Sequence, residues 1–148
     1  MRAVIQRVIN ASVFVDEKLI ARIGPGMLAL TAVSVSDNMA DVKWMADKLC
    51  GLRIFSDSEG RMNLDLSRIG GQILVVSQFT LYGDCRKGKR PSYTNSAKPP
   101  VAEELYNALI NEIKLKGVDV KSGVFGAMMK RELINDGPVT LIVDSPSL

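Results

Sequence analysis

Histidine is absent from this chain of 148 residues. Its absence excludes a Ser-His-Asp or Cys-His catalytic arrangement, and it excludes any metal site that depends on imidazole. If the chain is an enzyme, its acid–base chemistry must rest on carboxylates, lysine, hydroxyls, backbone groups or the substrate itself. We expect no metal and no cofactor.

Cysteine is scarce as well, since Cys50 and Cys85 are isolated and lack the spacing of metal ligands. We expect Cys50, at the end of a helical pattern, to be a core residue. Cys85 is expected to be an exposed thiol without a catalytic role, because no histidine is available to activate it.

Long apolar runs are also missing, because none approaches the roughly 18 residues that a membrane-spanning helix needs. The first residues run directly into a strand pattern without the features of a signal peptide, so we expect a cytoplasmic protein that has no membrane contact. The composition, 47% hydrophobic and 24% charged, is ordinary for a globular protein. We expect one domain over residues 1–148. The net charge of +3 permits a nucleic-acid partner without requiring one.

Hydrophobic periodicity predicts an α+β domain in which two main helices lie on an antiparallel, barrel-like sheet. One helix is expected from Met39 to Gly51 after the capping oxygens of 36–38, and a second from the Pro99-Pro100 pair to Gly117. Strands are expected over 4–15 (kinked near Asn10), 19–23, 27–35, 52–55, 73–76, 118–124, 128–134 and 139–143.

The most informative strand begins with the apolar run Ile73 to Val76. Ser77, Gln78, Phe79 and Thr80 follow, and they place two hydroxyls and an amide at the end of a buried strand. A strand end is rigidly held and still reaches solvent, so it is a good position for a site. A second stretch, Asn135 to Thr140, is expected to complete that site. A hairpin turn over 135–138 is the simplest interpretation of its composition, although a cis Gly137-Pro138 bond would instead present a fixed pair of carbonyl acceptors.

The most polar stretch, 83–98, carries five cations and a single acid. Residues 83–90 approach the phosphate-binding pattern G-x-x-x-x-G-K-[ST], but Arg90 replaces the hydroxyl and Pro91 follows where a helix should begin. Two interpretations remain open, a solvated loop and a contact with RNA phosphates. The RNA-binding interpretation assigns Arg86, Lys87, Lys89 and Arg90 to tRNA.

The motifs Ser-Gln-Phe-Thr at 77–80 and Asn-Asp-Gly-Pro-Val-Thr at 135–140 resemble the two signatures of the D-aminoacyl-tRNA deacylases. The resemblance covers essentially the whole chain, and it extends to 6–8, 52–55, 90–95, 98–100 and 123–127. It implies a carboxylic ester hydrolase of translation quality control, which frees tRNA from a D-amino acid or glycine.

The resemblance also implies how the site is built. Members are homodimers with active sites at the subunit interface, where a cis Gly137-Pro138 pair projects into the partner's pocket and rejects L-aminoacyl esters. Residues Ser77 to Thr80 would line the floor of the pocket, and Phe125 and Met129 would hold the terminal adenosine of the aminoacyl-tRNA.

Two mechanisms fit the residues. Thr80 could act as a nucleophile, or the enzyme could orient the ester while backbone N–H groups near Phe79 and Thr80 hold the oxyanion and the ribose 2′-hydroxyl assists water. We favour the second, because the sequence offers no evident base for Thr80. A non-catalytic module that binds the tRNA end is the alternative function.

Overall fold

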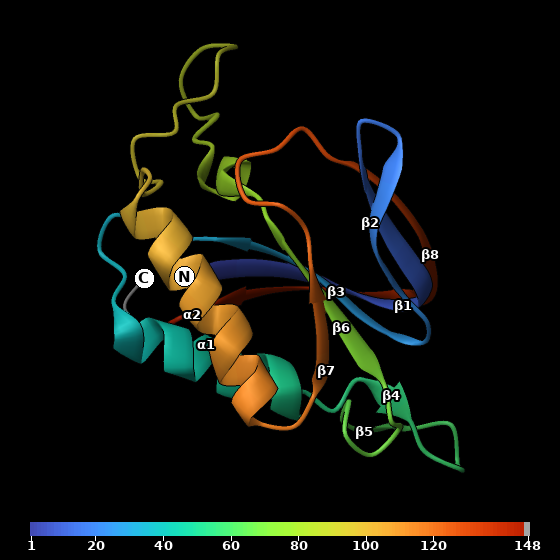
Figure 1. Ribbon diagram of the computed structural model, residues 1–148. Helices are drawn as coiled ribbons and strands as arrows, with labels where there is room; N and C mark the ends of the chain where they lie inside the picture. The colour runs from blue at the N-terminus through green and yellow to red at the C-terminus, as the bar shows by residue number, and fades with distance from the viewer. Residues whose placement is uncertain (147–148) are drawn as a thin grey trace.

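The computed structural model describes residues 1–146 as one mixed α/β unit (Figure 1). Its elements, in chain order, are β1 (Arg2–Val15), β2 (Lys18–Ile23), β3 (Gly26–Ala32), α1 (Met39–Gly51), β4 (Phe55–Ser56), β5 (Met62–Leu64), β6 (Gln72–Ser77), the 3-10 turn η1 (Phe79–Tyr82), α2 (Val101–Leu115), β7 (Asp119–Ser122) and β8 (Lys130–Asp144).

The main sheet has the strand order β2-β1-β3-β6-β7, with β8 paired to β1. The expected fold class, a barrel-like sheet carrying two helices, is confirmed, but the expectation of an antiparallel sheet is wrong in part. Strand β6 runs parallel to both β3 and β7. The reason is the connection: a helix lies between β3 and β6 and another between β6 and β7, and parallel neighbours need such crossovers.

Both helices cover one face of the sheet and pack against each other (Figure 1). The larger core lies between them and the sheet, and it includes Met45 and Leu49 of α1 with Leu109 and Ile113 of α2. A smaller core fills the opposite, concave face, where Leu74 and Val76 of β6 meet residues of β1 and β2. Strand β6 is therefore buried on both faces, as its apolar run predicts.

Helix α1 begins as the sequence predicts. Asn38 accepts a hydrogen bond from the Ala40 N–H, and Asp41 accepts one from the Asn38 N–H, which forms a capping box. Neither helix is long and apolar enough to be a membrane span, as far as the described residues go.

The predicted hairpin turn at 135–138 is wrong, because these residues lie inside the single long strand β8. Gln6 pairs with Thr140 and Val8 pairs with Asn135, so residues 136–139 bulge out opposite Arg7. Arg7 binds the bulge through the Asp136 carboxylate, and the Asn135 amide spans it by donating to the Arg7 and Val139 carbonyls. These tertiary contacts override the turn composition. The Gly137-Pro138 and Pro99-Pro100 peptide bonds are cis.

Candidate active site

The site begins where β6 ends. Ser77 is the last residue of the strand, and the Gln78 N–H donates to the Thr31 carbonyl of β3 at 2.7 Å, which fixes the exit of the chain. The chain then turns into η1, so Phe79 and Thr80 are presented at the surface, and the Phe79 side chain is 54% exposed. The prediction that this strand end reaches solvent is confirmed.

A cavity of about 720 Å³ opens beside this strand end. Its walls come from the ends of β3 and β6, from η1, from residues 93–99 with the start of α2, and from the loop 125–131. The volume lies within the usual range for small-molecule sites. Six of the predicted site residues line this one cavity: Ser77, Gln78, Phe79, Thr80, Phe125 and Met129.

The cavity has hydroxyls and amides but no carboxylate among its described lining residues; its charged side chains are the exposed cations Lys98 and Arg131. The Thr80 hydroxyl accepts a hydrogen bond from the Gln78 side-chain amide. Because an amide neither takes nor gives a proton near neutral pH, this contact positions Thr80 without activating it. Burial raises the pKa of Tyr106, whose neutral phenol donates to the Val75 carbonyl at 2.9 Å.

Gly137 and Pro138 do not line this cavity within one chain. Both are exposed on the β8 bulge. The expectation that the two sequence motifs form a site together is therefore not met inside a single chain. The bulge itself is held firmly: Arg7 is 9% exposed and donates to the Ile54 carbonyl at 2.6 Å while its Nε lies 2.8 Å from the Asp136 carboxylate.

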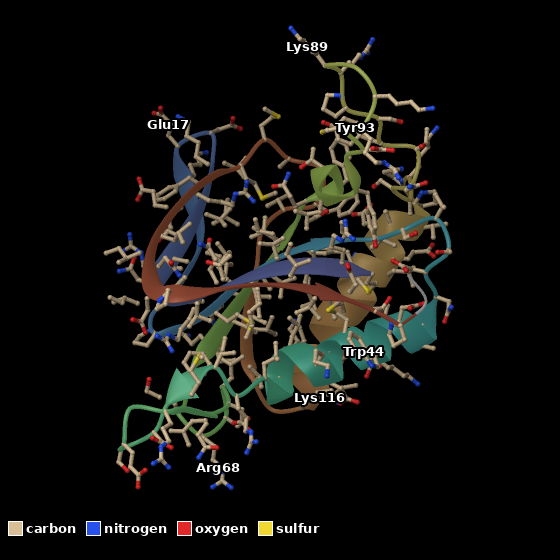
Figure 2. All side chains as sticks on the ribbon, turned by 180° about the vertical axis from the view of Figure 1, so that it is seen from behind. Glu17, Trp44, Arg68, Lys89, Tyr93 and Lys116 are labelled. Carbon is tan, nitrogen blue, oxygen red and sulfur yellow. The ribbon has the colours of Figure 1, made fainter. Side chains whose placement is uncertain are left out.

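The basic stretch forms a loop that projects from the body of the molecule, with Lys89 near its tip (Figure 2). Paired backbone hydrogen bonds between Asp84 and Ser92 close its base. Asp84 accepts two hydrogen bonds from the Arg86 guanidinium, and these lower the pKa of Asp84 to about 2. Within residues 1–146, Lys87, Lys89 and Arg90 take part in no ion pair.

The loop meets the candidate active site at its base, where Tyr93 packs edge-on against Phe79 with ring centroids 5.2 Å apart. No helix follows the loop until Val101, so the phosphate-loop interpretation is wrong. Cys85 is an exposed thiol on the loop, and Cys50 is a buried core residue. The predicted burial of Cys50 and the predicted exposure of Cys85 are both confirmed.

Several lining residues escaped the sequence reasoning, among them Thr31, Ser96, Tyr106 and Arg131. Thr31 and Tyr106 sit in apolar patterns that predict only core positions. Ser96 lies between the stretches 90–95 and 98–100 that carry the family resemblance, and it belongs to neither. In the described part of the chain, no group of three or more cysteine, aspartate or glutamate side chains is placed to hold a metal ion.

The chain is similar to known proteins over nearly its whole length. The family model described as D-Tyr-tRNA(Tyr) deacylase matches residues 4–144. The D-aminoacyl-tRNA deacylase of Thermoanaerobacter sp. (strain X514) is 53% identical over 148 residues, covering 100% of this chain and 99% of that protein. The D-aminoacyl-tRNA deacylase of Thermosipho africanus (strain TCF52B) is 54% identical over 145 residues, covering 98% and 97%.

Two solved structures share the fold. One, described as "c-Myc DNA Unwinding Element Binding Protein", has a TM-score of 0.92 and 36% identity and covers 99% of both chains. The other, described as a probable eukaryotic D-amino acid tRNA deacylase, has a TM-score of 0.82 at 21% identity and covers 96% of this chain and 97% of that one. The chain belongs to the D-Tyr-tRNA(Tyr) deacylase family, which confirms both the resemblance and the hydrolase class expected from its motifs.

Proposed function

We propose that this protein hydrolyses the ester of D-aminoacyl-tRNA, and also of glycyl-tRNA, and that it spares L-aminoacyl esters. The observation that carries the proposal is the cavity where Ser77 to Thr80 face Phe125 and Met129. A strand end with hydroxyl and amide groups suits an ester. An aromatic ring and a thioether in the same cavity suit the terminal nucleoside that every aminoacyl-tRNA shares.

The selectivity is proposed to come from exclusion by Gly137 and Pro138 of a second copy of the chain. Attraction to a side chain separates similar substrates by only about 1–3 kcal/mol, whereas a rigid wall can reject an L side chain and still accept many D side chains. Two observations support this role: the pair is exposed and outside its own cavity, and Arg7 and Asn135 brace the bulge that carries it. Its carbonyl groups would accept hydrogen bonds from the substrate α-ammonium.

A homodimer is proposed because β8 carries apolar side chains that this chain leaves uncovered. Ile134, Leu141 and Ile142 are 54%, 40% and 70% exposed, and they flank the Gly137-Pro138 bulge on the same strand. A second copy of the chain that covers these side chains would bring its own bulge close to the first chain's surface. In a two-fold dimer, each copy would then supply one pair to the other's cavity.

The favoured mechanism uses positioning rather than an activated side chain. An aminoacyl ester is already reactive, and the cavity walls described here contain no carboxylate that could serve as a base. The backbone N–H groups of Phe79 and Thr80 would hold the developing oxyanion. The ribose 2′-hydroxyl of the substrate would assist attack by water.

The decisive experiment is a deacylation time course on one tRNA charged in parallel with D-tyrosine, L-tyrosine and glycine, without added metal. We expect rapid loss of the D-tyrosyl and glycyl esters while the L-tyrosyl ester is spared. Equal loss of the D and L esters would discard the exclusion mechanism. Retention of every ester, with tRNA still bound, would favour the non-catalytic tRNA-end-binding module.

A further inference from the structure

Two aromatic side chains lie exposed at the mouth of the cavity. Phe79, in η1, is 54% exposed, and Tyr93, at the base of the basic loop (residues 83–98), is 39% exposed. The chain has one tryptophan, three tyrosines and four phenylalanines, all within the described part, and all the others are buried or half-buried. Single exposed apolar side chains are ordinary, but two exposed rings that meet at a cavity indicate a binding surface.

The fold holds the two rings in place. Tyr93 packs edge-on against Phe79, with ring centroids 5.2 Å apart and ring planes at 71°. The hydrogen bonds that close the base of the loop end at Ser92, and on the other side the Tyr93 carbonyl accepts from the Ser96 N–H at 3.0 Å. Gly83 makes room for the ring, since a Cβ atom there would lie 3.0 Å from the Tyr93 ring edge. The pair is therefore preorganised for a ligand.

The contact between the rings leaves much of their surface free. An edge-on contact uses the edge of one ring and one face of the other. The exposed fractions of Phe79 and Tyr93 show that both side chains still present surface to solvent. A flat apolar surface of this kind suits a flat partner, and the bases of an unpaired nucleic-acid strand stack on such side chains.

Unpaired positive charge lies next to the rings. Lys87, Lys89 and Arg90 are exposed and take part in no ion pair within residues 1–146. Figure 2 shows Lys89 near the tip of the loop and Tyr93 closer to the body of the molecule. Single-stranded RNA matches both features, because its phosphates bind cations while its bases stack. A protein partner would match the rings, but it gives no account of three cations without a counter-charge.

The order of these features selects one nucleotide of the proposed substrate. Phe79 and Tyr93 both line the cavity that is proposed to take the terminal aminoacyl-nucleoside, and Lys89 lies further out on the loop. An RNA chain that runs from the cavity to the loop cations passes the rings on its way. The first group to pass them is the nucleotide that precedes the terminal adenosine. It is unpaired in tRNA, so its base is free to stack on protein.

We propose that Phe79 and Tyr93 are positioning residues that stack the base of the nucleotide preceding the terminal adenosine; this inference rests on the proposed function and extends the same site outward along the RNA. Stacking on an aromatic ring tolerates every base, so the pair sets the direction of the strand without reading its sequence. The 3′ end thereby enters the cavity in one orientation, and the loop cations bind the phosphates that follow.

The test measures binding of uncharged tRNA, so that neither an ester nor an amino acid contributes. Fluorescence anisotropy compares the intact tRNA with the same tRNA lacking the base of the nucleotide before the terminal adenosine. We expect the wild type to bind the intact tRNA at least about fivefold more tightly, the lower end of what stacking of one base contributes. In Tyr93→Leu this preference should fall below about twofold. Tyr93→Phe keeps the ring and should keep the preference.

Two controls separate stacking from the neighbouring contacts. Lys89→Ala should weaken the binding of both tRNAs by the same factor, because it removes a phosphate contact and leaves the rings in place. A tRNA that lacks the terminal adenine instead should lose the same factor in affinity for the wild type and for Tyr93→Leu, because contacts that do not share a partner add independently. A Tyr93→Leu effect confined to the terminal adenine would assign the rings to that base and overturn the proposal.

The measurement is independent of the proposed activity, since no ester is hydrolysed in it. A preference that disappears in Tyr93→Leu and is kept in Tyr93→Phe would support the stacking site even if D-tyrosyl-tRNA were stable in the presence of the protein. Equal binding of the two tRNAs by the wild type, or a preference that survives in Tyr93→Leu, would overturn it even if D esters were hydrolysed normally. Loss of the wild-type oligomeric state in Tyr93→Leu, measured by sedimentation, would place the rings at a subunit contact and overturn it as well.

Discussion

Thr80 is exposed in η1, just beyond the end of β6, and its surroundings decide which mechanism is open to it. Its oxygen accepts from the Gln78 amide, and no carboxylate lines the described cavity. A nucleophilic hydroxyl needs a base that removes its proton, and an amide cannot do so. Thr80 is thus better suited to shaping the pocket than to forming an acyl-enzyme.

The variant Thr80→Ala should therefore keep at least about a tenth of the wild-type single-turnover rate on D-tyrosyl-tRNA, whereas loss of a true nucleophile costs roughly four orders of magnitude or more. Rapid-quench measurement of the remaining ester checks this. Ser58→Ala, which removes an exposed hydroxyl in the β4–β5 loop, is the control. A rate reduced to the uncatalysed level, with an acyl group trapped on Thr80 of the wild type, would establish the nucleophile instead.

Arg7 is the residue that ties the β8 bulge to the rest of the molecule. Its side chain is buried, and it binds the Ile54 carbonyl, the Asp136 carbonyl and the Asp136 carboxylate. The variant Arg7→Ala leaves these acceptors without their partner, so the free energy of unfolding should fall by about 3 kcal/mol. Urea denaturation measures the loss. Arg7→Lys should keep less than half of the unfolding free energy that Arg7→Ala loses, because a single ammonium cannot replace the guanidinium fork.

Exposed Arg22 offers the matched control, since it makes one hydrogen bond to Ser12. Arg22→Ala should lower the free energy of unfolding by less than about 1 kcal/mol.

If the role of Arg7 were purely structural, its substitution would leave substrate selectivity intact. If Arg7 holds the excluding wall, the folded fraction of Arg7→Lys should hydrolyse L-tyrosyl-tRNA faster relative to D-tyrosyl-tRNA than the wild type does. Wild-type stability of Arg7→Ala would contradict the bracing role.

At the scale of elements, the sequence predicts what depends on local pattern. The helices α1 and α2 follow from apolar spacing and end signals, and the buried strand β6 follows from its apolar run. The parallel direction of β6 was not predicted, although its signals are present: β6 is a continuous apolar run, and a predicted helix separates it from each parallel neighbour in the chain. The continuity of β8 was not predicted either, since Asn135 to Pro138 has turn composition and only the contacts of Arg7 and Asn135 keep it in the strand.

The residues of the candidate site likewise differ in whether the sequence could predict them. Ser77 to Thr80 were found because polar residues ended an apolar strand, and Phe125 and Met129 were found through the family motifs. Thr31 and Ser96 could not be found in this way. A single hydroxyl within an apolar strand or a polar loop is common, and only the tertiary structure reveals that these two are buried without partners.

The basic loop is the element through which tRNA would be held. Three of its cations, Lys87, Lys89 and Arg90, are exposed and make no ion pair with the described residues, whereas Arg86 is engaged by Asp84. Alanine at all three positions should make the slope of log K for tRNA binding against log salt less steep by about two to three, since each phosphate contact contributes roughly 0.7–0.9 to its magnitude. Binding measured across a series of NaCl concentrations gives this slope.

A triple variant with the same charge change elsewhere, Lys43→Ala, Arg61→Ala and Lys114→Ala, is the control and should keep the wild-type slope. Arg86→Ala alone should change the slope by less than one, because its guanidinium is already paired with Asp84. An unchanged slope in the loop variant would mean that the loop is merely solvated and that tRNA is bound by another surface.

On the scale of the whole molecule, one chain carries both parts of the proposed shared site without joining them. The cavity lies beside η1 and α2, and Gly137 and Pro138 lie on β8 outside it. If two copies associate through the exposed Ile134, Leu141 and Ile142, each cavity meets the partner's bulge.

The variant Ile142→Glu should place a charge in this interface and give monomers in sedimentation analysis. The control Leu115→Glu, at the end of α2 where Leu115 is 80% exposed, should leave the dimer intact.

Subunit mixing tests whether the site is truly shared. One variant, Phe125→Ala with Met129→Ala, has a damaged cavity, and another, Pro138→Ala with Gly137→Val, has a damaged bulge; each alone should lose selective D-ester hydrolysis. In a mixed dimer, the intact cavity of the second meets the intact bulge of the first. Unfolding and refolding the two in equal amounts should therefore restore about a quarter of the wild-type selective activity, since half of the dimers are mixed and each has one good site. No recovery, with mixed dimers demonstrated by mass spectrometry, would place each bulge on its own chain's cavity and refute the shared site.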